Sequence, residues 1–172
     1  MSEKPRPSDE RLATVKLVIF DFDGILTDNR VSVSESGERT KCFWVPDGVG
    51  IFMGHKAGLK FAIITGNDDG ATRHRAEFLR IDDLNQGVRD KKSTYEEVKS
   101  RHLVSDAECL FIGDDLPDLG VFRRAGITLA PADAHPRILE AAQWVGRSRG
   151  GGGIVREAID ALLEARGYEW PD

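Results

Sequence analysis

The sequence predicts an α/β fold built on a doubly wound parallel sheet, and three short apolar runs carry this prediction. Residues 17–20, 61–64 and 110–112 are almost continuously apolar. Runs of this kind are typical of strands that are buried on both faces of a parallel sheet. Helical stretches separate the runs, and the alternation of strands with helices favours a doubly wound arrangement.

The remaining elements follow from the same patterns. Two weaker strands are expected at residues 127–130 and 144–145. The helical stretches are expected at residues 49–57, 70–79, 93–101, 116–124, 136–142 and 154–166. One low-complexity run, residues 150–153, consists of four glycines and is either a flexible linker before the last helix or a segment that reaches a neighbouring site.

One segment, residues 30–44, interrupts the alternation of strands and helices. Two stretches of strand-like residues flank a turn that contains Gly37. This pattern predicts a β-hairpin that projects from the sheet as a flap. The alternative is a structural excursion with no role in function.

Length and composition limit the classes of protein to which the chain can belong. The chain has 172 residues, of which 40% are hydrophobic and 31% charged. We expect one domain over residues 13–172, preceded by a disordered polar tail over residues 1–12.

The formal net charge of −5 disfavours nucleic acid as a partner. No apolar run approaches the roughly 20 residues that span a bilayer. Two cysteines without metal-type spacing favour reduced thiols and a cytoplasmic location.

Polar side chains follow each of the three apolar runs. Asp21, Thr65 and Asp114 stand at the carboxyl ends of the predicted strands, where ligands of open parallel sheets bind. Further charged residues accompany them in the sequence: Asp23, Lys91, Asp115 and Asp118. So many carboxylates at one edge repel one another unless a cation lies among them. Oxygen-only ligands favour a hard ion such as Mg²⁺.

Four of these segments, taken in order, resemble the motifs of haloacid dehalogenase-type phosphatases. The motifs match residues 21–27 (DFDGILT), Thr65-Gly66, Lys91 and residues 113–118 (GDDLPD). The resemblance implies a Rossmann-like core and a Mg²⁺-dependent phosphatase. The spacing between motifs leaves no room for a separate cap domain.

The resemblance also implies a role for each matched residue. Asp21 would be the nucleophile that forms an aspartyl-phosphate, and Asp23 the general acid and base. Thr65 and Lys91 would bind the phosphoryl oxygens. Mg²⁺ would be held by Asp21, the carbonyl of Asp23, and Asp114. Asp118 and Asp115 would support the metal site or orient Lys91. A capping role is the alternative for Asp115, and Lys92 is the rival of Lys91.

Within that superfamily the chain looks like the 3-deoxy-D-manno-octulosonate 8-phosphate phosphatases. The hairpin, the Asp47-Gly48 pair, residues 132–136 and the glycine run carry this likeness. It implies a homotetramer in which neighbouring subunits help to close each site. The substrate-binding positions it implies are Asp47, Gly48, Thr65, Gly66, Asn67, Arg75 and Lys91.

The chain departs from this subfamily where arginine or asparagine side chains are expected. The departures are Trp44, Pro46, Phe52, Asn67 and Gly152. Arginine forks are natural partners of a sugar carboxylate or phosphate. The alternatives therefore stay open: a phosphatase for a nine-carbon sialic-type 9-phosphate, another sugar phosphate or a macromolecular phosphoryl group, and a non-catalytic oligomerisation module.

Overall fold

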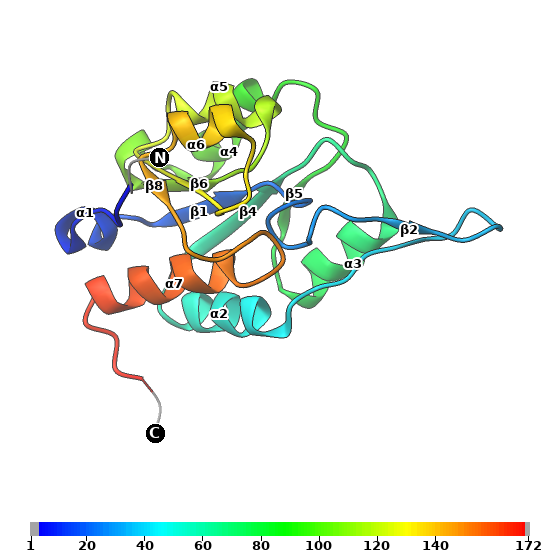
Figure 1. The fold of residues 1–172 in the computed structure, drawn as a ribbon. Helices are drawn as coiled ribbons and strands as arrows, with labels where there is room; N and C mark the ends of the chain where they lie inside the picture. The colour runs from blue at the N-terminus through cyan, green and yellow to red at the C-terminus, as the bar shows by residue number, and fades with distance from the viewer. Residues whose placement is uncertain (1–3, 171–172) are drawn as a thin grey trace.

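The computed structural model describes residues 4–170, and its core is a six-stranded parallel sheet (Figure 1). The strand order is β5-β4-β1-β6-β7-β8. The strands are β1 (Leu17–Phe20), β4 (Lys60–Ile64), β5 (Asp83–Asn85), β6 (Cys109–Ile112), β7 (Ile127–Ala130) and β8 (Trp144–Val145). The predicted doubly wound α/β fold is confirmed.

Helices cover both faces of the sheet. One face carries α1 (Asp9–Ala13), α2 (Val45–Lys56), α3 (Gly70–Phe78) and α7 (Ile154–Ala165). The other carries α4 (Lys91–His102), α5 (Leu119–Phe122) and α6 (Pro136–Ala141). Connections that run from β1 towards β5 use the first face, whereas those that run towards β8 use the second. This division follows from the right-handedness of parallel crossovers.

The order of the strands reverses at β1, and this reversal positions the site. β1 lies between β4 and β6, and Phe20 is aligned with Ile63 and Ile112. The chain leaves β1 in one direction and later returns to its other side. A crevice therefore opens beyond the carboxyl end of β1, the point where doubly wound sheets bind ligands.

The predicted hairpin is present and is formed by β2 (Ser32–Val33) and β3 (Arg39–Thr40). Its paired residues are exposed, and Figure 1 shows it projecting beyond the rest of the molecule. The next helix, α2, begins four residues before the predicted start, because Pro46 in its first turn fits the opening of a helix.

Other elements also differ from the sequence prediction. Residues 116–124 form a 3₁₀ turn, η2 (Leu116–Asp118), followed by the short α5, because Asp115 and Asp118 cap the turn. Helix α4 begins at Lys91 rather than at residue 93, since Asp90 caps it. Strand β5 was not predicted: its one apolar residue, Leu84, gives no apolar run.

The tail expected to be disordered over residues 1–12 is ordered from Lys4 onward, so that expectation is wrong there. Residues 1–3 lie outside the described part of the chain. Leu12 on α1 is fully buried against the core that α7 covers. The carbonyl oxygen of Lys4 accepts a hydrogen bond from Val145 N at 3.0 Å, so the tail also pairs with the edge strand β8.

The glycine run is an ordered turn rather than a loose linker. Gly151 has φ +61° and donates a backbone hydrogen bond to Ile25 O at 2.9 Å. A Cβ on Gly150 would lie 1.9 Å from Gly24 O, so only glycine allows this approach. The turn before α7 therefore packs directly on the loop that follows β1.

Candidate active site

Asp21 follows the last residue of β1 and lies at the reversal point of the sheet. Its backbone N–H donates to Ile112 O at 3.0 Å, which continues the pairing of β1 with β6. Its Oδ1 accepts a hydrogen bond from Phe22 N at 2.6 Å. Its Oδ2 lies 2.7 Å from Lys91 Nζ. The carboxylate is therefore fixed, with one oxygen paired to a cation.

Lys91 opens α4, and its ammonium joins two carboxylates. Besides Asp21, the Nζ atom donates to Asp118 Oδ1 at 2.8 Å. Burial disfavours the ammonium, but the two carboxylates outweigh burial and raise the pKa of Lys91. Lys92, the rival candidate, is exposed. The structure thus brings Lys91 to the predicted site and leaves Lys92 at the surface.

Asp114 and Asp118 complete an acidic cluster with Asp21. One carboxylate oxygen from each of the three lies within 4.8 Å of the others. Asp118 Oδ2 accepts the backbone N–H of Asp114 at 3.0 Å, which holds the loop after β6 in place. Asp115 is exposed, and its Oδ1 accepts a hydrogen bond from Leu116 N and caps η2. This is the capping role that was the alternative for Asp115.

The cluster gathers three carboxylates around one ammonium. Burial and, after it, the charges of Asp21 and Asp118 together raise the pKa of Asp114 to about 8. Burial also raises the pKa of Asp21 to about 6, against the opposing effect of Lys91. Among residues 4–170, no hydrogen-bond donor reaches the buried Asp114 Oδ1. An oxygen-lined site with this excess of negative charge fits a divalent cation such as Mg²⁺.

Gly24 allows Asp114 to lie close to the β1 loop. Its φ is +82°, and a Cβ there would lie 2.1 Å from Asp114 Oδ2. Asn29 also has a positive φ, and its Nδ2 donates to the same oxygen at 3.0 Å. Asn29 was not predicted from the sequence. The one feature that could have indicated its role is its position just after the first motif.

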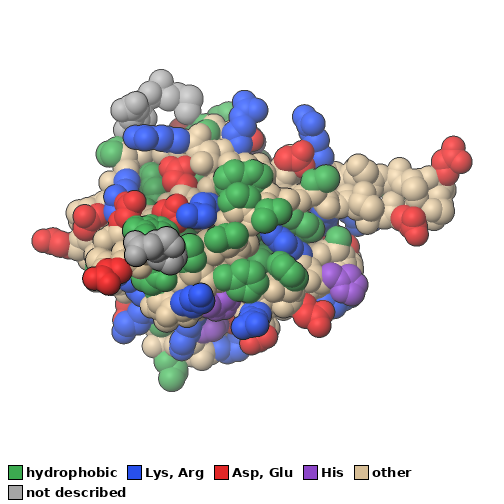
Figure 2. All heavy atoms as spheres, turned by 90° about the horizontal axis from the view of Figure 1, so that it is seen from below, with side chains coloured by type: hydrophobic (Ala, Val, Ile, Leu, Met, Phe, Trp, Pro, Cys, Tyr) green, Lys and Arg blue, Asp and Glu red, His purple; other side chains and the backbone are tan. Residues whose placement is uncertain are grey.

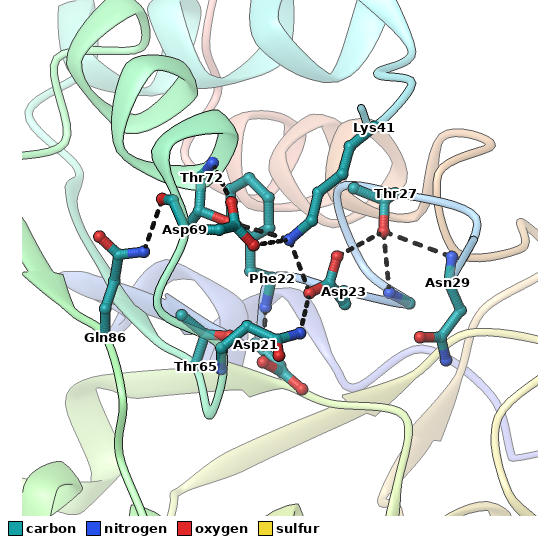
Figure 3. A network of polar contacts seen from close by, with 12 residues as sticks. Asp21, Phe22, Asp23, Thr27, Asn29, Lys41, Thr65, Asp69, Thr72 and Gln86 are labelled. Atoms are coloured by element: carbon teal, nitrogen blue, oxygen red, sulfur yellow. Dashed lines mark hydrogen bonds and ion pairs between the residues drawn. The ribbon is translucent and has the colours of Figure 1, made fainter. Parts of the chain in front are cut away.

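Asp23 lies beside this cluster and is held by three side chains (Figure 3). Its Oδ1 accepts a hydrogen bond from Thr27 Oγ1 at 3.1 Å. Its Oδ2 accepts one from Asn67 Nδ2 at 2.6 Å and lies 2.8 Å from Lys41 Nζ. Lys41 was also missed, because nothing in the hairpin sequence separates this lysine from a solvated one.

Thr65 follows β4 and is buried, with Gly66 and Asn67 exposed after it. Its backbone N–H donates to Asn85 O at 2.9 Å. Its Oγ1 accepts a hydrogen bond from Asn67 N at 3.3 Å. Asn67 thus links the end of β4 to the Asp23 carboxylate.

The structure gives Asp47, Gly48 and Arg75 contacts outside the acidic cluster. Asp47 is fully buried, and its Oδ1 accepts Arg156 N at 2.8 Å in the first turn of α7. Burial raises the pKa of Asp47 to about 6 despite this bond. Arg75 lies over the ring of Phe43 at 4.9 Å, and a Cβ on Gly48 would meet it at 3.1 Å. Their roles in substrate binding stay predictions.

The family of the chain follows from its similarity to known proteins. A model of haloacid dehalogenase-like hydrolases matches residues 80–157. The KdsC 3-deoxy-D-manno-octulosonate 8-phosphate phosphatase of Yersinia pestis is 38% identical over 157 residues, or 91% of this chain and 84% of that enzyme. The chain belongs to the KdsC family of haloacid dehalogenase-like phosphatases. It is accordingly a phosphoric monoester hydrolase.

Solved structures of the KdsC family share the fold. A Moraxella catarrhalis 3-deoxy-D-manno-octulosonate 8-phosphate phosphatase in complex with magnesium, phosphate and KDO is 31% identical, with a TM-score of 0.89 over 92% of this chain and 91% of that one. A cobalt-bound phosphatase from Haemophilus influenzae is 34% identical, with a TM-score of 0.88 over 91% and 92%. The capless core expected from the sequence is confirmed.

Proposed function

We propose that this KdsC-family phosphatase hydrolyses the phosphate monoester of an eight-carbon 2-keto-3-deoxy sugar acid, with 3-deoxy-D-manno-octulosonate 8-phosphate as the first candidate. One observation carries the chemistry: Asp21 meets Lys91, Asp118 and Asp114 beyond β1, and Asp23 is held two residues away. The relatives carry the substrate, since their activity is named for this sugar acid.

The residues support a two-step reaction. In the first step an Asp21 oxygen attacks phosphorus, the bond from phosphorus to the sugar oxygen breaks, and Asp23 gives its proton to that oxygen. In the second step Asp23 takes a proton from water as the water oxygen attacks phosphorus and the bond to Asp21 breaks. Lys91 and Thr65 would hold the phosphoryl oxygens. Asp21, the Asp23 carbonyl and Asp114 would hold Mg²⁺, which would neutralise negative charge on the phosphoryl group.

We further propose that the active form is a homotetramer assembled through the hairpin. Val33 on the hairpin is 65% exposed. Several apolar side chains near the start of α2 and the end of α3 are also exposed: Trp44, Val45, Val49 and Phe78. Figure 2 shows apolar side chains gathered on this side of the molecule, with the hairpin projecting beside them. Contiguous exposed apolar surface marks interaction sites.

The proposed location is the cytoplasm. Among the described residues, no helix has the length and apolarity needed to cross a membrane. Both cysteines are free thiols, Cys42 exposed and Cys109 buried. Reduced thiols suit a cytoplasmic enzyme.

A phosphate-release screen with Mg²⁺ tests the substrate. It includes eight-carbon and nine-carbon keto acid phosphates, simple hexose phosphates and a phosphopeptide, with Asp21→Asn as the control for contaminating phosphatase. We expect the highest kcat/KM on the eight-carbon acid. A higher value on a nine-carbon acid would assign the second candidate, which the replaced arginine positions at Phe52 and Asn67 leave open. No turnover above the Asp21→Asn control on any compound would contradict the proposal.

A further inference from the structure

Lys41 is a buried cation at the base of an exposed hairpin. It directly follows β3, whose residues Arg39 and Thr40 are both exposed, yet its own side chain is 0% exposed. Burying an ammonium is costly unless charged and hydrogen-bonding partners compensate. The partners of Lys41 therefore indicate why the chain places a lysine there.

Three oxygen atoms surround the ammonium of Lys41 (Figure 3). The Nζ atom lies 2.8 Å from Asp23 Oδ2 and 2.6 Å from Asp69 Oδ2. It also donates to Thr72 Oγ1 at 3.1 Å. The contacts with Asp23 and Thr72 are hydrogen bonds, and the contact with Asp69 is an ion pair. The ring of Phe22 lies 5.0 Å away and shields the group further.

Two of these partners belong to the start of α3, whereas the third is the proposed acid and base. Asp69 caps α3 by accepting Thr72 N at 2.8 Å, and Thr72 is buried in the first turn of that helix. Burial opposes the charge of Asp69, but its contacts with Lys41 and Thr72 outweigh burial and lower its pKa. The start of α3 therefore fixes the ammonium, and the ammonium reaches Asp23 from that fixed point.

The contacts of Asp23 divide its two oxygens. Oδ2 faces both Lys41 Nζ and Asn67 Nδ2, whereas Oδ1 faces the Thr27 hydroxyl. The carboxylate is thus held from two sides, and the contacts on Oδ2 tie it to Lys41 and to the loop after β4. Its orientation therefore depends on where Lys41 places Oδ2.

We infer that Lys41 is a positioning residue for the phosphatase reaction: it anchors the Asp23 carboxylate to the start of α3 and so fixes the orientation from which Asp23 acts. The inference rests on the acid and base role of Asp23 in the proposed function. General acid catalysis contributes on the order of 10²–10⁴-fold, and it depends on hydrogen-bond geometry. Loss of the anchor should therefore remove part of that factor without removing the nucleophile.

The test compares two leaving groups in Lys41→Met. A sugar alkoxide needs a proton as it leaves, whereas the phenolate of p-nitrophenyl phosphate leaves without one. For a primary alkyl phosphate that the wild-type enzyme hydrolyses, we expect kcat/KM to fall about 10- to 100-fold, a part of the acid-catalysis factor. For p-nitrophenyl phosphate we expect a change below about threefold. Lys60→Met, which removes an exposed lysine at the opposite end of β4, should change neither value.

A double-mutant cycle with Asp23→Asn gives a second readout. If Lys41 acts through Asp23, adding Lys41→Met to Asp23→Asn should cost no further activity on the alkyl phosphate. Equal losses on both leaving groups, or additive losses in the cycle, would overturn the inference. If Lys41→Met does not fold, Asp69→Asn serves instead, since it loosens the anchor and should give a smaller loss that is again confined to the alkyl ester.

The design separates this inference from the proposed substrate. Failure of the wild-type enzyme on eight-carbon acid phosphates would refute the substrate alone. The comparison then uses whichever alkyl phosphate the screen identifies, and the dependence on leaving group still decides the role of Lys41.

Discussion

Replacing Asp114 by asparagine should stabilise the metal-free protein while abolishing its response to Mg²⁺. The pKa of Asp114 is raised from 3.8 to about 8 in the folded state. The folded protein therefore binds the Asp114 proton more tightly than the unfolded chain does. The stability that this bound proton contributes is lost as the pH rises from about 4 to about 8. Asparagine never carries the charge, so the variant escapes that loss.

The size of the effect follows from the shift. At about 1.4 kcal/mol for each pKa unit, the full shift corresponds to about 5 to 6 kcal/mol. Burying the asparagine amide also costs free energy, and Asp21 and Asp118 remain, so we expect a net gain of about 2 kcal/mol at pH 8. In a protein of this length that gain raises Tm by about 4–8 °C. Near pH 4 the two proteins should unfold at similar temperatures.

The assay is thermal unfolding in chelator and in Mg²⁺ across this pH range. At a Mg²⁺ concentration 100 times Kd, the wild-type protein should gain about 2.7 kcal/mol, whereas Asp114→Asn should gain none. Asp82→Asn is the matched control, since Asp82 is exposed, and it should behave like the wild type. A metal-free Asp114→Asn protein that is less stable than the wild type at pH 8, or one that Mg²⁺ still stabilises, would refute the reasoning.

Three further predictions concern turnover and assembly. Asp21→Asn should abolish phosphate release and Asp23→Asn should slow it on the order of 10²–10⁴-fold, measured by steady-state kinetics; an active Asp21→Asn protein would refute the aspartyl-phosphate route. Ca²⁺ should inhibit in competition with Mg²⁺, because it accepts more and longer oxygen contacts; equal rates with the two ions would contradict this. Replacing residues 32–40 by a short Gly-Ser linker, which keeps Lys41, should release monomers in light scattering; an unchanged tetramer would exclude the hairpin from the assembly.

The convergence of the main site residues could be predicted from the sequence. Asp21, Thr65 and Asp114 each follow an apolar strand, and parallel strands end at one edge of the sheet. Asp118 and Lys91 were placed through the motif resemblance, and the structure brings both to Asp21. Their catalytic roles remain predictions, because position alone does not measure turnover.

Other features depend on contacts that no local pattern encodes. β5 is an edge strand of polar residues whose place is set by its pairing with β4. α1 is a five-residue helix that owes its order to Leu12 in the core. Lys41 resembles any hairpin lysine until α3 supplies Asp69 and Thr72. Each of these features depends on a contact with residues distant in sequence. Composition and periodicity do not reveal such contacts.

The glycine turn ties completion of the active site to completion of the chain. Gly150 and Gly151 pack on the backbone of residues 24–28, although these segments stand near opposite ends of the sequence. During synthesis, the loop after Asp21 cannot acquire this support until the turn has left the ribosome. Contacts of such long sequence separation slow folding, because the chain between the two segments must first close into a loop. A nascent chain or a proteolytic fragment that ends before Gly150 should therefore carry every catalytic side chain and still lack the support that holds the nucleophile loop.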